Sequence, residues 1–198
     1  MTCSKDKDGN ISNAVNKDKD GNPVALSSDA LQLVTAINDH SVKVEVSASI
    51  KATHTSTDRL MVGGAFIGSE ITDKKATSPA GEEVYVVNAK QGINPNVLSA
   101  ADEVHGKPGA NTLHEATEAY YGALISQKSY KSSGPGSDTN PTCLAAHGAA
   151  TPQSGEIRSR FLDKMGGPTP GMLPGVIYAV QFYVIDSKGK EVEIMRFK

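Results

Sequence analysis

The chain has 198 residues, a formal net charge of −2, 38% hydrophobic residues, 5% aromatic residues and no tryptophan. That length fits one domain, or one domain with a tail, and is enough to bury a substantial core. The slightly acidic balance argues against a nucleic-acid partner, which normally meets a basic surface, and no run of about 18 apolar residues is present to span a membrane.

The first 26 residues are predicted to be a tail with an internal repeat, because the hexapeptide KDKDGN occurs at 5–10 and again at 17–22. The pattern D-x-D-G resembles part of an EF-hand calcium loop, but the later ligands, including the bidentate glutamate, are absent. We therefore favour two Asp-Gly hairpin turns between short strands at 11–15 and 23–26.

The start of this tail, Thr2-Cys3-Ser4, resembles the acylated-cysteine start of a mature bacterial lipoprotein. It predicts an exported chain, secreted or held at the cell surface, with Cys3 as the lipid-anchoring residue. Cys3 lies far from Cys143 in the sequence, and two separate thiols are favoured over a disulfide.

Residues 27–198 are predicted to form one α+β domain. Its first half is expected to contain a helix at 29–38, strands at 42–50, 60–67 and 83–89, and a surface loop at 73–82. The strand at 42–50 alternates apolar and polar residues, which is typical of a half-buried antiparallel strand. Gly63 and Gly64 suit either an edge strand that lines the site and pairs with an extended substrate, or a bulged strand that turns a corner.

The second half of the domain is expected to begin with irregular chain at 92–109, where Asn-Pro and Pro-Gly pairs act as breakers. After it we expect a central helix from 108–112 to 126, a loop to 141, a short helix at 142–151, a helix at 156–164, a loop at 166–175, and a C-terminal β-hairpin of strands 176–185 and 192–197.

The central helix carries the residues with the most specific chemistry. His114 and Glu118 are four positions apart and so project from one helix face, and Glu115 can reach a water held on that side. The pattern is the metallopeptidase signature H-E-x-x-H with its second histidine replaced by glutamate. Zinc accepts imidazole nitrogen and carboxylate oxygen, so the pair forms a zinc site if a third ligand arrives. His147, on the next short helix, is our candidate, with His105 ranked second.

These residues predict metal-assisted hydrolysis. Three protein ligands and an open fourth position are typical of catalytic zinc, which lowers the pKa of its bound water towards about 7. Glu115 would accept the proton as general base, and Tyr121, on the same helix face, would donate a hydrogen bond to the developing oxyanion. One alternative is structural: Thr112-x-x-Glu115 also fits a capping box, in which Glu115 bonds back to the backbone.

Several segments together resemble a known family: Asn88-Ala89, Val97-Leu98, Gly106–Gly109, Leu113–Ser126 and Ala146-His147. They look like the C-terminal toxin domains of RHS/YD-repeat and related polymorphic toxins, which resemble zincin-like metallopeptidases. The likeness covers roughly residues 25–155 and is most specific at 114–126 and at Ala146-His147.

This resemblance implies a zincin-like α+β fold, in which a mainly antiparallel sheet packs on a metal-bearing helix with a second short helix beside it. It also implies an exported bacterial effector that cleaves a peptide or protein substrate and is countered by an immunity protein. By resemblance, the metal ligands are His114, Glu118 and His147, and Glu115 is the general base. The chain departs from the family at Glu118, where zincins carry histidine.

Two other functions are compatible with the same residues. One is a non-enzymatic exported or lipoprotein binding domain with an inactive metal site, which the DKDGN turns and the lipoprotein-like start favour. The other is a structural zinc that only staples two helices together, in which case chelation would lower stability without removing any activity.

Overall fold

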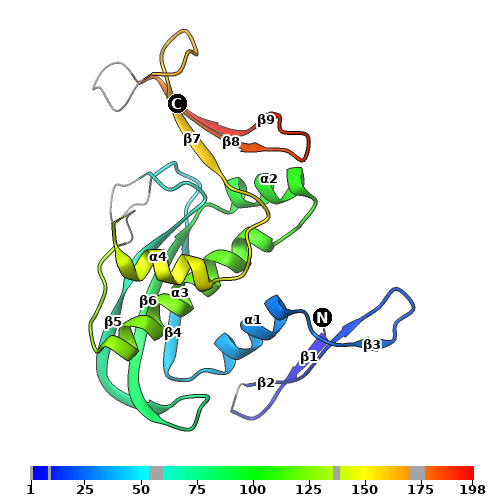
Figure 1. Ribbon diagram of the computed structural model, residues 1–198, viewed down its shortest axis with the longest axis vertical. Coiled ribbons are helices and arrows are strands. Elements are labelled where there is room, and N and C mark those ends of the chain that lie inside the picture. Colours follow the sequence, from blue (N-terminus) through cyan, green and yellow to red (C-terminus); the bar gives the residue numbers. More distant parts are fainter. Residues whose placement is uncertain (1, 9, 54–59, 136–138, 170–176) are drawn as a thin grey trace. The chain divides into compact units, whose positions relative to one another are not determined.

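A computed structural model of the chain (Figure 1) describes residues 2–8, 10–53, 60–135, 139–169 and 177–198. Its elements are β1 (Thr2–Lys5), β2 (Ile11–Lys17), β3 (Pro23–Val24), α1 (Ser28–Asn38), β4 (Val42–Ala48), β5 (Gly64–Thr77), β6 (Glu83–Ile93), α2 (Pro95–His105), α3 (Ala110–Ser129), α4 (Pro141–Ala149), β7 (Arg158–Leu162), β8 (Ala179–Ile185) and β9 (Glu191–Phe197). Three three-stranded sheets and four helices in these ranges make the chain α+β, as predicted.

The chain divides into two compact units. The first comprises residues 1–45, 68–89 and 117–151, and the second comprises 46–67, 90–116 and 152–198. Strands β4, β5 and β6 and helix α3 each contain residues of both units. In the part of the chain that the structure describes, no helix is both long enough and apolar enough to cross a membrane.

The N-terminal segment of the first unit is a small antiparallel sheet in the order β1-β2-β3. In its first turn Asp6 Oδ1 accepts hydrogen bonds of 2.9 Å from the backbone N–H groups of Asp8 and Asn10. Asp18 Oδ1 makes the same pair of contacts in the second turn, with the N–H groups of Asp20 and Asn22. These carboxylates therefore close their own turns, and the prediction of hairpin turns is confirmed.

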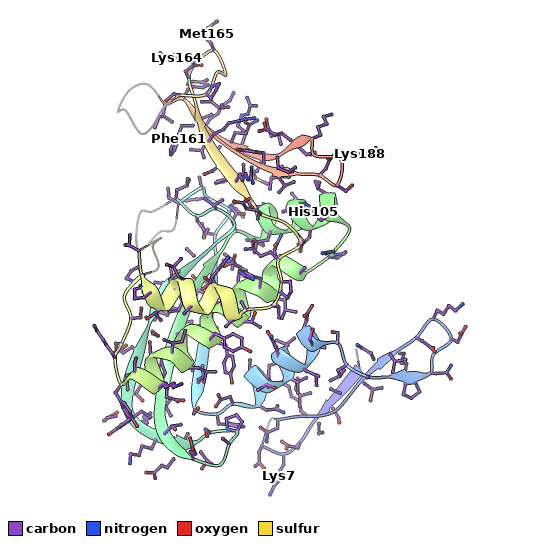
Figure 2. All side chains as sticks on the ribbon, viewed as in Figure 1. Lys7, His105, Phe161, Lys164, Met165 and Lys188 are labelled. Atoms are coloured by element: carbon purple, nitrogen blue, oxygen red, sulfur yellow. The ribbon has the colours of Figure 1, made fainter. Side chains whose placement is uncertain are left out.

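The same turn recurs in the second unit, between β8 and β9. There Asp186 Oδ1 accepts from the backbone N–H groups of Lys188 and Lys190, both at 2.9 Å. Figure 2 labels Lys7 and Lys188 at the tips of the first and last of these turns. The pattern D-x-x-G-x thus stabilises hairpins at both ends of the chain through an Asp side chain that substitutes for a backbone acceptor.

Helix α1 confirms its prediction to within one residue, with Ser27 as N-cap accepting from the Ala30 N–H. The strand after it differs from expectation. Ser41 O accepts from Val87 N–H and Ile93 O accepts from Ser49 N–H, each at 2.9 Å, so partners advance together along β4 and β6. This is the pattern of a parallel pair, and the prediction of an antiparallel strand was wrong here.

The core face expected for β4 was also wrong in part. Val42 is buried, but Val46 is 46% exposed and Ile50, beyond the strand's end, is 68% exposed. Because β4 is an edge of the sheet order β4-β6-β5, few neighbours are available to cover its far end. Alternation reports which residues share a face and does not report what covers that face.

Two further elements were assigned to the wrong class. The chain at 92–109 contains α2, because Asn94 is an N-cap that accepts from the Val97 N–H and Pro95 occupies the first helical turn. The Asn-Pro pair that was interpreted as a breaker is therefore a helix start. The helix ends at Gly106, whose φ of 64° is the left-handed C-cap conformation.

The helix expected at 156–164 is instead strand β7, which pairs antiparallel with β8, and β8 pairs antiparallel with β9. The C-terminal hairpin is confirmed, while residues 170–176 of the expected loop lie outside the described residues. The surface loop expected at 73–82 is shorter than predicted, since β5 continues to Thr77. Helix α2 contacts this C-terminal sheet, and His105 Nε2 lies 3.0 Å from Ile185 O.

Within the first unit, helix α3 contacts the sheet of strands β4, β6 and β5. Gln127 Nε2 donates to Tyr85 O at 2.7 Å, and the hydroxyls of Ser69 and Ser126 lie 2.6 Å apart in the interior. Tyr120 donates a buried 2.9 Å hydrogen bond to Asp39, which anchors the same helix to the start of the sheet. These polar contacts fix the rotation of α3 about its axis more narrowly than apolar packing alone does.

Candidate metal centre

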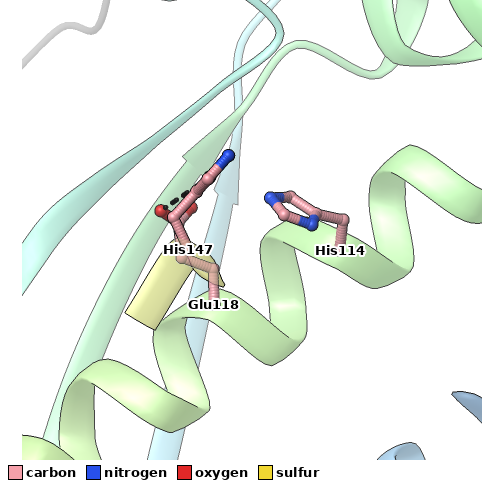
Figure 3. Close-up of side chains that lie close together, drawn as sticks. All are labelled: His114, Glu118 and His147. Carbon is pink, nitrogen blue, oxygen red and sulfur yellow. Dashed lines mark ion pairs between the residues drawn. The ribbon is translucent and has the colours of Figure 1, made fainter. Parts of the chain in front are cut away.

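Helix α3 supplies two of the predicted ligands. His114 and Glu118 lie four residues apart on it, and Figure 3 shows both side chains on one side of the helix. Both are buried, with 3% and 5% of their surfaces exposed. A buried carboxylate and a buried imidazole side by side are costly unless each has a polar or cationic partner.

The third ligand comes from α4, which lies across α3 in Figure 1. Asn140 caps α4 by accepting from the Thr142 N–H, and Thr151, just beyond its end, donates its backbone N–H to Thr117 Oγ1 at 3.1 Å. Ala146, the residue before His147, is fully buried. This places His147 at Glu118, with its side chain 53% exposed.

The three side chains converge in a geometry that fits a metal ion. One ligand atom from each of His114, Glu118 and His147 lies within 4.8 Å of the others, and the group could hold a metal ion. His147 Nδ1 is 3.5 Å from Glu118 Oε1, the ion pair marked in Figure 3. Ligands bound tetrahedrally to zinc at 2.0–2.2 Å stand about 3.4 Å from each other, so this pair already has a suitable separation.

The exposed position of His147 leaves the group accessible to water. Two buried ligands on one rigid helix and one half-exposed ligand on a second helix resemble an open site more than a closed four-ligand one. Cys143, one turn before His147, places its Sγ 3.9 Å from Glu118 Oε1. Sequence analysis missed this neighbour, although the four-residue spacing from His147 could have pointed to it.

Glu115, the predicted general base, is buried with 6% exposure. Its Oε2 accepts a hydrogen bond from the side-chain amide of Gln91 on β6. The same carboxylate lies against Gly64, the first residue of β5, where an added Cβ would fall 1.9 Å from Glu115 Oε2. The capping-box alternative was wrong, because α3 begins at Ala110 and Thr112 lies inside it rather than at its N-cap.

Tyr121 follows the H-E-x-x-E motif on α3, and its position does not decide the role predicted for it. Tyr121 is half-buried and packs edge-to-face on Tyr120, with ring centroids 5.5 Å apart. Tyr120 is buried, and burial together with its bond to Asp39 raises its pKa above the ordinary value. Oxyanion stabilisation by Tyr121 stays a prediction.

The remaining histidines of the described residues lie outside the metal group. His105, ranked second as a ligand, places Nδ1 2.9 Å from Ala101 O within α2 and Nε2 3.0 Å from Ile185 O, and the second contact joins α2 to the C-terminal sheet. His40 is exposed and its ring contacts Asn10. His54 and the side chain of Cys3 lie outside the described residues.

Comparison of the chain with models of known protein families, with curated protein sequences and with solved structures gave no match. The chemistry of the site therefore has to follow from its own residues and their geometry.

Proposed function

We propose that the chain is a zinc-dependent hydrolase of the metallopeptidase type, with His114, Glu118 and His147 as ligands and Glu115 as general base. The observation that carries this proposal is the convergence of two imidazoles and one carboxylate from two helices within 4.8 Å. Two histidines and one glutamate are also the ligand set of several known catalytic zinc sites. The zincin-like identity suggested by the motif belongs to this proposal.

The reaction we propose is hydrolysis of an amide bond by water. A zinc ion held by His114, Glu118 and His147 would supply Lewis acidity, which would lower the pKa of a water at the site to about 7. Glu115 accepts a proton as the water oxygen attacks the carbonyl carbon, and it then transfers the proton to the amine as the carbon–nitrogen bond breaks. The half-exposed His147 keeps one side of the group open for the substrate.

An extended peptide is the substrate that the surrounding backbone suits. Strand β5 is an edge of the order β4-β6-β5, and it begins at Gly64, directly against Glu115. Among the described residues, its outer side is paired at Ser69, which exchanges backbone hydrogen bonds with Ser133. A peptide that adds to the edge at 64–67 would run past the carboxylate of Glu115.

Metal analysis and proteolysis test the proposal together. The wild-type chain should bind about one zinc per molecule, in accordance with the one three-ligand group found among the described residues. His114→Ala should lose this zinc, whereas His40→Ala, a control at an exposed histidine, should retain it. Glu115→Gln should keep the zinc and lose cleavage of an unfolded protein substrate. Zinc-loaded wild type without any cleavage would instead indicate a structural metal.

The exported, toxin-like role is a further part of the proposal and has its own cellular test. Expression of the wild-type chain in bacteria should slow growth, and Glu115→Gln should remove the effect, since the toxin role requires hydrolysis. Equal growth of the two strains would contradict a toxic hydrolase. A neighbouring gene product that restores growth would identify an immunity protein.

A further inference from the structure

We propose that Gln91 is a positioning residue for the catalytic glutamate: its side-chain amide and the missing side chain of Gly64 together hold the Glu115 carboxylate in one orientation. This inference rests on the proposed function, because it gives Glu115 the role of proton acceptor. It adds two residues, on β6 and β5, that the H-E-x-x-E motif does not contain.

Gln91 acts through Glu115 and not on the substrate. Its side chain is fully buried at 0% exposure, so substrate cannot reach it. The amide nitrogen donates to Glu115 Oε2, and the backbone around it is held in the sheet, where Gln91 O accepts from Ser47 Oγ at 3.3 Å. A charge-assisted hydrogen bond from a rigid strand restricts a carboxylate that would otherwise sample several rotamers.

Gly64 makes room for this orientation. A Cβ at this position would lie 1.9 Å from Glu115 Oε2, 2.0 Å from Cδ and 2.4 Å from Oε1. The φ angle of Gly64 is not in the left-handed region, in contrast to that of Gly63 at +88°. Glycine is therefore required at 64 for space and not for backbone conformation.

The hydrogen bond from Gln91 sets the direction in which the Glu115 carboxylate presents its oxygens. A general base works well only when the accepting atom lies within hydrogen-bond reach of the proton, and a displacement of about 1 Å can cost about 10²-fold in rate. The Gln91 amide thus contributes to turnover without contact with substrate or metal.

The test compares Gln91→Leu with the wild type. We expect zinc content and KM to be unchanged and kcat to fall by about 10²-fold, because binding is preserved and only the proton acceptor is displaced. Ser154→Ala is the matched control: it removes the 2.7 Å hydrogen bond from Asn111 Nδ2, one turn before Glu115, and should leave kcat unchanged.

Gly64→Ala is the second variant, and it keeps the proposal testable if Gln91→Leu does not fold. Its added Cβ displaces the same carboxylate and should give the same loss of kcat with zinc retained. Unchanged kcat in a folded variant, or loss of zinc in parallel with activity, would overturn the positioning role. Wild-type protein without zinc-dependent cleavage would overturn the proposed function itself, and the positioning role with it.

Discussion

The contact between Gly64 and Glu115 makes a quantitative prediction about stability. In Gly64→Ala the new Cβ would lie 1.9 Å from Glu115 Oε2, whereas ordinary contacts begin near 3.4 Å, so the oxygen must move by about 1.5 Å. That movement breaks its hydrogen bond from Gln91. A hydrogen bond to a charged group contributes about 1.5–3 kcal/mol. Alanine in a strand is otherwise favoured over glycine by about 0.5–1 kcal/mol.

The effect of Gly64→Ala on the free energy of unfolding should have opposite signs in the wild-type and Glu115→Ala backgrounds. In the wild-type background Gly64→Ala should lower the free energy of unfolding by about 1–2 kcal/mol, which is the lost hydrogen bond less the strand preference. In a Glu115→Ala background no carboxylate opposes the Cβ, and the same substitution should raise stability by about 0.5–1 kcal/mol. The coupling energy between positions 64 and 115 is then about 1.5–3 kcal/mol, the value of the lost hydrogen bond.

The assay is urea unfolding of the four proteins with a chelator present, so that metal binding does not contribute to the measured free energies. Gly148→Ala is the matched control, since an added Cβ there meets nothing within 4 Å. Its effect should be the same whether residue 115 is glutamate or alanine. If Gly64→Ala proves additive with Glu115→Ala, the carboxylate does not lie over Gly64 and the reasoning fails.

Tyr120→Phe should cost about 1.5–3 kcal/mol of unfolding free energy, because the buried bond to the Asp39 carboxylate is lost, and an unchanged urea midpoint would contradict that bond. Zinc at about 100 times its Kd should stabilise the wild type by about 2.7 kcal/mol, and His147→Ala by much less. Equal thermal shifts would exclude His147 as a ligand. Hydrogen bonds from backbone N–H groups hold the pKa of the Asp18 and Asp186 carboxyls below 3.8. The largest contribution comes from the N–H of Asn22 at Asp18 and from the N–H of Lys190 at Asp186. The NMR titration midpoints of both carboxyls should therefore fall below 3.8. Since the folded pKa is depressed, the turns are fully stabilised above the unfolded value of about 3.9 and lose this support as the pH falls through the folded pKa. A midpoint at or above 3.8 would refute the Asp contacts.

The errors in the predicted elements share a physical origin. The start of α2 at Asn94-Pro95 can be interpreted as a breaker or as an N-cap followed by proline, and the choice depends on whether the following residues find a core. Val97, Leu98 and Ala101 are buried, so in this chain they do. Strand β7 was assigned to a helix because a five-residue segment is too short for periodicity to decide. Its pairing with β8 decides it instead.

The parallel direction of β4 relative to β6 had no sequence signal either. Alternating residues within β4 define its two faces, whereas strand direction depends on the path of the intervening chain. Likewise, neither Gln91 nor Gly64 belongs to a recognisable motif. Gln91 is 24 residues from Glu115, and their bond exists because β6 passes beside α3.

The sequence by itself determined the features whose hydrogen bonds close within four residues. The Asp turns and the N-cap of α1 are of this kind, because one short segment holds both the donor and the acceptor. The shared face of His114 and Glu118 is equally local, because their spacing of four residues is about one helical turn. Only the tertiary structure decided that His147 meets Glu118 and that Glu115 rests between Gln91 and Gly64. Those contacts join segments that lie far apart in the sequence, and the packing of helices and strands, which no local pattern encodes, sets which side chains meet.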